Sequence, residues 1–368
     1  MKKVGIITFH AAHNYGSMLQ AYALQQTVLG LGYECEIINL RTKIQRKIYS
    51  PFFMNKGLAK KLKAIRYPRL AIEAIKKHRK FEKFLHEKCL LSPHTYTTAE
   101  ELKNANLDYD YYISGSDQIW NTSCSDFLSS FYLDFVKCGK RIAYAPSMGP
   151  KPFKDIDKKF YPFIKKSVAH YDAVAVREQD EVILLEQVAN ITPPVVLDPT
   201  LLVNPQDWSS LAGNKPLING NYIFIYTPHY ENYKPLFTTA LKLAQMHDLK
   251  IICSLPDNVS RWRNEPRFQY YTAVGPIEFL NLVKYSKYVF CGSFHAVVFS
   301  ILFYKPFFAY DGMNDSRIAP LLTMTNLEQC AEIQEGQLPV SYNNEKTKEK
   351  LESHISKSIQ YLKNVIND

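Results

Sequence analysis

Short apolar runs alternate with longer amphipathic segments along the chain, and this alternation predicts strands separated by helices. The runs that predict strands in the first half are 4–9, 34–39, 109–114, 141–145 and 172–176. Those in the second half are 222–226, 250–254, 288–291 and 306–310. Helices are expected at 16–31 and 178–188, and between the strands of the second half. The pattern therefore predicts an α/β protein with two doubly wound parallel sheets.

The boundary between the two sheets is predicted at the turn-rich stretch 204–221, which separates the two sets of strands. A chain of 368 residues also exceeds one ordinary core and favours two domains. We therefore predict an N-terminal domain over 1–203 and a C-terminal domain over 204–343. The polar segment 344–368 is expected to form a closing helix that packs back on the first domain.

The segment 288–310 combines this pattern with candidate chemistry. Its first strand leads to a turn at Gly292 and Ser293, and then to an apolar helix with Phe294 and His295 in its first turn. A helix N-terminus at the carboxyl end of a strand favours a bound anion. A histidine there can hydrogen-bond a phosphate or carboxylate, or move a proton. The alternative is a core histidine that only caps its own helix.

The loop after the first strand opens the first predicted helix. Its backbone N–H groups and the Asn14 side chain can face a ligand, with Tyr15, Gly16 and Gln20 beside them. The loop lacks the G-x-G-x-x-G spacing, so a dinucleotide site is not supported. Ordinary helix capping by Asn14 is the alternative.

Two more loops follow the third and fourth predicted strands. Ser116, Asp117 and Gln118 place small and polar groups where sugar hydroxyls can bind, and Ser147 lies in a second small-residue loop. Asp117 can act as a base, but capping a helix is the simpler role for it.

Arg177 ends the fifth predicted strand. It either pairs with a nearby carboxylate or offers its fixed fork to a carboxylate or phosphate of a ligand. Asp198, which precedes Pro199 and Thr200, is expected to be structural more than catalytic.

Composition fits a globular protein of a reducing compartment. Apolar residues make up 46% of the chain and charged residues 22%. The 7 cysteines are odd in number and widely spaced, so neither a disulfide framework nor a metal site is predicted. No apolar run approaches the roughly 20 residues that cross a bilayer, and the start of the chain predicts a strand instead of a signal peptide. We expect a cytoplasmic location.

Positive charge is concentrated in the segment 41–90. This segment holds 16 Lys/Arg against 3 acidic residues, a net charge of +13, whereas the whole chain carries +10. Apolar residues are interleaved at helical spacing, and a basic amphipathic helix can lie on an anionic membrane surface. A solvated helical face is the alternative. Nucleic acid is not expected as a partner, because no nucleic-acid-binding module accompanies the charge.

Six motifs occur in order between residues 4 and 310 and together resemble the polysaccharide pyruvyl transferase family. They are NYGSMLQAYAL (14–24), YYISGSDQIWN (111–121), AYAPSMG (143–149), AVRE (175–178), LDPTLLV (197–203) and GSFHAVVFSILFYKPF (292–307). The resemblance implies a GT-B-like fold, in which two Rossmann-like domains face a cleft. It also implies transfer of pyruvate from phosphoenolpyruvate to a sugar of a surface polysaccharide, an exopolysaccharide or its lipid-linked precursor. A pyruvate ketal would form and phosphate would be released.

Carried over by position, the resemblance gives His295 and Arg177 the central roles. Asp117 is a third catalytic candidate because of its place in the loop after the third predicted strand. His295 would contact the phosphate or act as the acid, and Arg177 would clamp an anionic group of the donor. The substrate-binding candidates are Asn14, Tyr15, Gly16, Gln20, Ser116, Gln118, Ser147, Gly292, Ser293 and Phe294. The first domain would hold the acceptor and the second the donor. Phosphoenolpyruvate is the donor substrate, and neither a cofactor nor a metal is implied.

The chain departs from the family at Ser293, where some members carry an arginine two residues before the histidine. Lys305 and Arg317 are candidates for the missing charge. Two other classes stay open, namely a GT-B-type glycosyltransferase with a nucleotide-sugar donor and a non-catalytic saccharide- or membrane-binding protein. If the acceptor is lipid-linked, the basic segment 41–90 would hold the enzyme peripherally at the inner face of the membrane.

Overall fold

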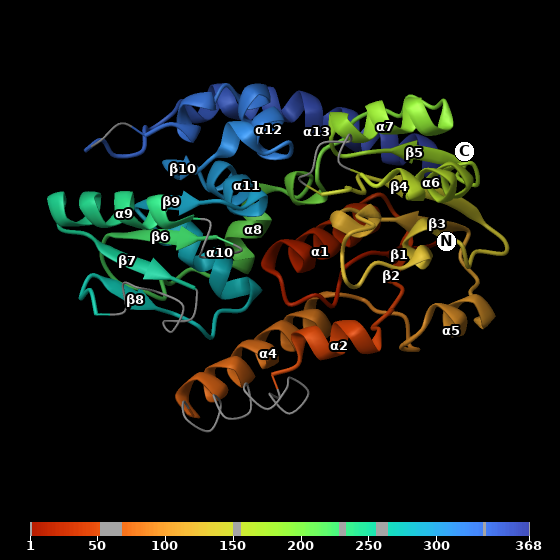
Figure 1. Cartoon of the computed structure of the whole chain (residues 1–368), viewed down its shortest axis with the longest axis horizontal. Coiled ribbons are helices and arrows are strands. Elements are labelled where there is room, and N and C mark those ends of the chain that lie inside the picture. Colours follow the sequence, from red (N-terminus) through yellow and green to blue (C-terminus); the bar gives the residue numbers. More distant parts are fainter. Residues whose placement is uncertain are drawn as a thin grey trace. The chain divides into compact units, whose positions relative to one another are not determined.

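The computed structural model describes residues 2–51, 68–149, 156–227, 233–254, 264–333 and 336–367. The chain forms two compact units, and each contains one five-stranded parallel sheet (Figure 1). The first unit comprises Met1–Tyr49, Leu85–Val203 and Glu352–Asp368. The second unit comprises Ser50–Phe84 and Asn204–Leu351. The α/β class that the strand pattern predicts is confirmed.

The first sheet has the strand order β2-β1-β3-β4-β5, and all neighbouring strands run parallel. Its strands are β1 (Lys3–Ile7), β2 (Glu34–Ile37), β3 (Tyr111–Ser114), β4 (Lys140–Tyr144) and β5 (Ala173–Ala175). The chain adds β2 on one side of β1 and then adds β3 on the other side. Open α/β sheets bind ligands outside the carboxyl ends of their strands at such a switch point.

The first unit contains several described helices, short 3₁₀ helices and an aromatic core. The helices are α1 (Tyr15–Gly30), α2 (Lys43–Tyr49), α5 (Ala99–Asn104), α6 (Tyr161–Val168) and α7 (Gln179–Ala189). Short 3₁₀ helices occur at η2 (Gln118–Trp120), η3 (Ser129–Tyr132), η5 (Lys158–Phe160) and η6 (Pro199–Leu201). Trp120 stacks on Tyr132 at 4.6 Å between ring centroids, and both are buried. The indole N–H of Trp120 donates to Ser114 Oγ, which fixes the chain where it leaves β3.

The second sheet has the order β10-β9-β6-β7-β8 and is also parallel throughout. Its strands are β6 (Tyr222–Tyr226), β7 (Lys250–Cys253), β8 (Phe268–Tyr270), β9 (Tyr288–Cys291) and β10 (Phe307–Ala309). Strands β6 and β9 are apolar and lie in the interior of the sheet, as expected for strands covered on both faces. The carboxyl end of β9 is therefore held rigidly in the middle of the sheet.

The second unit also contains several helices. They are α4 (Pro68–Lys88, of which the last turn belongs to the first unit), α8 (Pro205–Leu211), α9 (Lys234–Met246), α10 (Pro276–Tyr285), α11 (Phe294–Leu302) and α12 (Ile318–Thr325), with 3₁₀ helices η9 (Gly312–Asn314) and η10 (Glu328–Ala331). Phe237 of α9 packs in one core cluster with Ile225, Ile251 and Phe290 from three strands. Every residue of α11 is buried, because the helix lies inside the unit.

The closing helix α13 (Asn344–Asn367) changes unit along its length. From Glu352 onward it belongs to the first unit. The Leu197 amide donates to Ser358 Oγ at 3.0 Å, and the Tyr361 ring lies 6.3 Å from that of Tyr144. The helix therefore supports the chain just before η6.

Two features differ from the sequence-based predictions. Strand β8 was not predicted, because a three-residue run with a glutamine in its centre is too short to give a strand pattern. The basic segment 41–90 was assigned wholly to the first domain, but Ser50–Phe84 belongs to the second unit. The reason is a set of specific bonds: Lys80 Nζ pairs with Glu278 at 2.8 Å and donates to the Ala273 carbonyl. Residues 52–67 of the segment lie outside the described residues.

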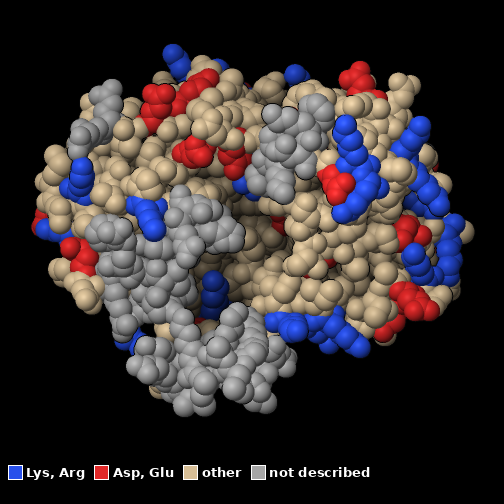
Figure 2. All heavy atoms as spheres, in the orientation of Figure 1, with Lys and Arg blue, Asp and Glu red and all other residues tan. Residues whose placement is uncertain are grey.

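Charged side chains of both signs are interspersed over the described surface that Figure 2 shows. On α4, Lys76 pairs with Glu73 at 2.9 Å, and Lys80 is held by Glu278. Part of the positive charge predicted from the segment is therefore balanced within the second unit. Among the described residues, the helices lack the combination of length and apolarity that a membrane span needs.

Candidate functional site

A buried polar network lies at the carboxyl edge of the first sheet, where the chain leaves β1, β3 and β5. Asp198, the residue before η6, accepts hydrogen bonds from Ser116 Oγ at 3.0 Å and from Arg177 Nη1 at 2.9 Å. Its other oxygen accepts from the amide and hydroxyl of Thr200. Ser116 is joined in turn to β1, because Thr8 Oγ1 donates to its carbonyl. The network thus ties together strand ends that are far apart in the sequence.

Arg177 is the cation of this network. Its Nε donates to Glu178 Oε1 and its Nη1 to Asp198 Oδ2, and its side chain is only 4% exposed. Burial alone would lower the pKa of Arg177, but the carboxylates of Glu178, Asp198 and Asp117 outweigh that effect and raise it. Of the two roles open to Arg177 from sequence, pairing with carboxylates is the one that the structure displays.

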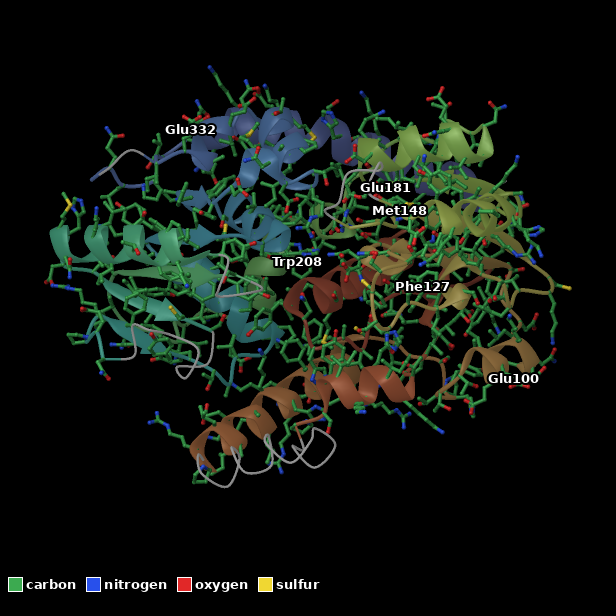
Figure 3. The ribbon with its side chains drawn as sticks, viewed as in Figure 1. Glu100, Phe127, Met148, Glu181, Trp208 and Glu332 are labelled. Atoms are coloured by element: carbon green, nitrogen blue, oxygen red, sulfur yellow. The ribbon has the colours of Figure 1, made fainter. Side chains whose placement is uncertain are left out.

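Glu178 and Glu181 form the second part of the network. Glu178 is the N-cap of α7, and its amide donates to Glu181 Oε2 at 2.9 Å. Glu181 Oε1 accepts from the amide of Met148, which lies beside it in the loop after β4 (Figure 3). Sequence reasoning missed both glutamates. The signal was the spacing Glu178-x-x-Glu181 directly after an apolar strand, which is a capping-box pattern.

Asp117 has an unusual backbone conformation. Its φ of 74° and ψ of −180° lie in a region that is essentially restricted to glycine and costs on the order of 1–3 kcal/mol for other residues. Its Oδ1 accepts from the Gln118 amide at 2.8 Å, so it caps η2. Its carbonyl accepts from the Ser147 amide at 2.9 Å. The surrounding bonds hold the strained residue at the end of β3, and strain of this kind is concentrated at functional sites.

The other candidates near these strand ends are mostly structural in their contacts. Ser147 is fully buried, and its Oγ accepts from the Gly149 amide. Gln118 is half-buried, and its Oε1 accepts from Asn121 Nδ2. These contacts shape the two loops, and they leave the partly exposed Gln118 side chain as the member of this group that can reach a ligand.

Asn14 caps the start of α1, which is the alternative to a ligand contact that the sequence left open. Asn14 Oδ1 accepts from the amides of Gly16 and Ser17, and Asn14 is exposed. Tyr15 is buried, as is Gln20, whose Nε2 donates to Thr8 Oγ1 at 2.9 Å. Gln20 therefore extends the network around Ser116 instead of facing solvent.

His295 lies in the first turn of α11, after the N-cap Ser293. Phe294 and His295 are both buried, and their rings meet edge to face at 5.1 Å. The N–H groups of the first helical turn have no intrahelical acceptor, so they and the helix dipole favour an anion at this end of the helix. His295 is 9% exposed, and the Nε2 atom of its imidazole is buried.

Gly292 is required by a close neighbour. The Tyr233 hydroxyl donates to the Gly292 carbonyl at 3.0 Å, and a Cβ at position 292 would lie 1.9 Å from Tyr233 Cε1. Tyr233 thus holds the turn that starts α11. Nothing near Tyr233 in the sequence indicates this contact.

The two cations considered as substitutes at Ser293 have other surroundings. Arg317 binds Asp315 through two bonds, Nε to Oδ1 at 2.9 Å and Nη2 to Oδ2 at 2.6 Å. Lys305 follows the opposite end of α11, where its amide donates to the Ser300 carbonyl. Burial and the nearby Lys284 lower the pKa of Lys305. Lys305 is thus at the wrong end of the helix, and Arg317 is already paired.

Comparison with known proteins gives a family and a fold. A family model described as polysaccharide pyruvyl transferase matches residues 14–312. Among solved structures, the chain is similar to the UDP-GlcNAc 2-epimerase from Methanocaldococcus jannaschii, with a TM-score of 0.54 and 12% identity over 100% of this chain and 99% of that chain. It is also similar to S. aureus MnaA in its structure with UDP, with a TM-score of 0.52 and 10% identity over 100% and 98% of the two chains. Likeness at such low identity concerns the fold, which is GT-B. Among curated proteins, no sequence match was found.

Proposed function

The chain belongs to the polysaccharide pyruvyl transferase family, and we propose that it transfers pyruvate from phosphoenolpyruvate to a sugar of a surface polysaccharide or its lipid-linked precursor. A pyruvate ketal forms and phosphate is released. The observation that carries this proposal is the family match over most of the chain, which includes both His295 and Arg177. Arg177 follows the carboxyl end of β5, the edge strand of the first sheet, and His295 lies in the first turn of the helix after β9, an interior strand of the second sheet.

The chemistry of ketal formation sets what the site has to supply. One sugar hydroxyl oxygen bonds to C2 of phosphoenolpyruvate while C3 gains a proton and becomes a methyl group. A second hydroxyl oxygen then bonds to C2 as the bond from C2 to the phosphate oxygen breaks. One of the two hydroxyl protons is matched by the proton that C3 gains, and the other leaves with the phosphate. The site therefore needs an acid that protonates C3, a base that deprotonates the hydroxyls, and cationic or dipolar groups that bind the donor.

The described residues offer these groups. His295 at the N-terminus of α11 would bind the phosphate or deliver the proton, since imidazole can do either near neutral pH. Asp117 would serve as a base toward a sugar hydroxyl, with Gln118 and Asn14 binding other hydroxyls. Arg177 would act on the donor by exchanging one of its carboxylate partners for an anionic group of the ligand. Acid–base help of this kind is worth roughly 10²–10⁴-fold in rate.

A phosphate-release assay tests the proposal. The protein is incubated with phosphoenolpyruvate and a panel of glycosides that carry neighbouring or 4,6-related hydroxyl pairs. Phosphate release that depends on one glycoside, with a product heavier by the mass of a pyruvate ketal, supports it. UDP-sugars serve as the competing donors. Turnover with a UDP-sugar and none with phosphoenolpyruvate would show a glycosyltransferase instead.

If the acceptor is lipid-linked, the protein has to approach a membrane, and α4 is the helix of the basic segment that we propose contacts it. Arg69 and Arg79 are exposed cations of this helix and can approach anionic headgroups. We expect the double variant R69Q/R79Q to bind anionic vesicles more weakly than wild type, while phosphate release with a soluble glycoside is unchanged. A matched variant, K215Q/K250Q, removes two exposed lysines elsewhere in the second unit. Equal loss of vesicle binding in both variants would reject α4 as the membrane surface.

A further inference from the structure

The network at the carboxyl edge of the first sheet contains an excess of buried carboxyl groups. Arg177 lies with Glu178, Glu181 and Asp198, and each of these three acidic residues is no more than 3% exposed. An ionised carboxylate in such surroundings is strongly unfavourable unless a cation or several donors compensate it, and the group otherwise takes up a proton. Arg177 already serves Glu178 and Asp198 directly. Glu181 accepts backbone amides, from Met148 and Glu178.

The hydrogen bonds indicate where a proton would reside. Both oxygens of Glu181 accept backbone amides, from Met148 and from Glu178. Glu178 Oε1 accepts from Arg177, whereas Glu178 Oε2 is buried without a donor in the described part of the chain. A buried acceptor that lacks a donor is costly. A proton on Glu181 would supply that donor to the Glu178 side chain.

The electrostatic surroundings act in the same direction. Burial, followed by the negative charge of Glu178 and the hydrogen bond to its side chain, raises the pKa of Glu181 well above 4.5. The Met148 amide and Arg177 lower it, but by less. The other ionisable groups nearby are Asp180 beside Glu178, Asp117 beside Arg177, Tyr132 facing Glu181, and the exposed Lys165 and Lys166 of α6, which packs on α7.

We propose that Glu181 is a protonated positioning residue, which donates its proton to Glu178 Oε2 and so fixes the Glu178 carboxylate against the Arg177 guanidinium. With Glu181 neutral, the two carboxylates that bond Arg177 directly, Glu178 and Asp198, are the ionised partners of its guanidinium. Its orientation at the end of β5 is then set by Glu178 on one side and Asp198 on the other. The part of this inference that concerns the donor rests on the proposed function, whereas the protonation of Glu181 does not.

A stability measurement tests the proton directly. A carboxyl group whose folded-state pKa is raised contributes stability that is fully present below its ordinary pKa and is lost as pH rises through the raised value. We therefore expect the urea midpoint of the wild-type protein to fall as pH is raised from 5 to 9. Glu181→Gln is neutral at every pH, so its urea midpoint should lack this fall. Its Nε2 cannot accept the backbone amide that one Glu181 oxygen accepts, so a constant loss of stability is expected and the slope against pH is the quantity to compare. The matched control is Glu186→Gln, an exposed glutamate of the same helix, which should follow wild type.

The result that overturns the proposal is equally specific. If Glu181 is ionised throughout this pH range, wild type and Glu181→Gln will show the same change of urea midpoint with pH. A wild-type midpoint that does not change with pH also overturns it. These outcomes do not depend on any substrate.

A kinetic measurement tests the positioning role. Glu181→Gln should keep KM for phosphoenolpyruvate and kcat near the wild-type values at neutral pH. Glu181→Ala leaves Glu178 without its donor, and a displacement of about 1 Å at a reacting centre costs roughly 100-fold in rate, so a fall of that order in kcat/KM for phosphoenolpyruvate is expected. Rescue by glutamine but not by alanine separates positioning from general packing. Unchanged kcat/KM in Glu181→Ala overturns the positioning role. Absence of phosphoenolpyruvate turnover in the wild type would instead count against the proposed function and leave the pH result standing.

Discussion

The hydroxyl group of Tyr233 donates to the carbonyl oxygen of Gly292 at 3.0 Å, and the tyrosine ring fills the space where a Cβ at position 292 would lie. Gly292 directly follows β9, and α11 with His295 in its first turn starts two residues later. The contact therefore sets the position of the helix N-terminus at which we propose that the donor phosphate binds. A small residue is needed at 292 because of this ring.

Replacing Gly292 with alanine should destabilise the protein. The new methyl group would lie 1.9 Å from Tyr233 Cε1, so the ring or the turn has to move, and overpacking of this kind typically costs about 1–3 kcal/mol. Urea unfolding measures the loss. Gly30→Ala is the control, because a Cβ at position 30 meets nothing within 4 Å. In a Tyr233→Ala background the cost of Gly292→Ala should shrink, and an unchanged cost would contradict the steric explanation.

Replacing His295 with alanine should abolish most pyruvyl transfer while the fold is retained. We expect kcat to fall by roughly 10²–10⁴-fold if the imidazole moves a proton. If it only binds phosphate, KM for phosphoenolpyruvate should rise and His295→Asn should recover part of the affinity. The exposed His247, mutated to alanine, controls for histidine loss in general. Full activity in His295→Ala would reject its proposed role.

The sequence predicted the local units of the fold well because they are encoded by neighbouring residues. The strands at 222–226 and 288–291 were predicted with the observed boundaries, since each is an apolar run bounded by polar or small residues. The turn at Gly292 and a helix with His295 in its first turn followed from the same short stretch. Asn14 as a helix cap was also foreseen as the alternative to a ligand contact, and its side chain accepts from the amides of the first turn.

The partners of the site residues were not predictable in the same way. Asp198 receives its bonds from Ser116 and Arg177, residues 82 and 21 positions away, and the Tyr233 contact to Gly292 spans 59 positions. The pattern of apolar and polar residues indicates which segments are buried, but it does not indicate which polar side chains form hydrogen bonds with one another. The pairing depends on strand order, and strand order is a tertiary property.

Replacing Arg177 with lysine should be strongly destabilising. Lysine cannot reproduce the two separate bonds from Nε to Glu178 and from Nη1 to Asp198, and it would leave buried carboxylates without a partner. Removing one partner of a buried ion pair costs about 3–5 kcal/mol. The control is Arg267→Lys, because Arg267 pairs with Asp248, whose side chain is 95% exposed, and surface pairs contribute about 0–1 kcal/mol. Similar urea midpoints for the two variants would show that the buried network does not hold the first unit together.

Variants at Asp117 can separate the effect of backbone strain from that of the side chain. Its φ of 74° is unfavourable for a residue with a Cβ, whereas its Oδ1 stabilises η2 by accepting the Gln118 amide. Asp117→Ala keeps the strain and loses the cap, so it should be less stable than wild type by about 1 kcal/mol. Asp117→Gly also loses the cap but removes the strain, which is on the order of 1–3 kcal/mol. Its thermal midpoint should therefore equal or exceed that of wild type.

The activity of the glycine variant then decides the role of the carboxylate. If Asp117 is the base toward a sugar hydroxyl, Asp117→Gly should be stable but inactive, with kcat reduced by roughly 10²–10⁴-fold. If Asp117 only caps η2, the glycine variant should keep its activity, because the loop is no longer strained and its backbone bonds to Ser147 remain. A glycine variant that keeps both stability and turnover would reject the base and leave the cap of η2 as the role of the Asp117 side chain, so the two measurements together test both the strain and the base.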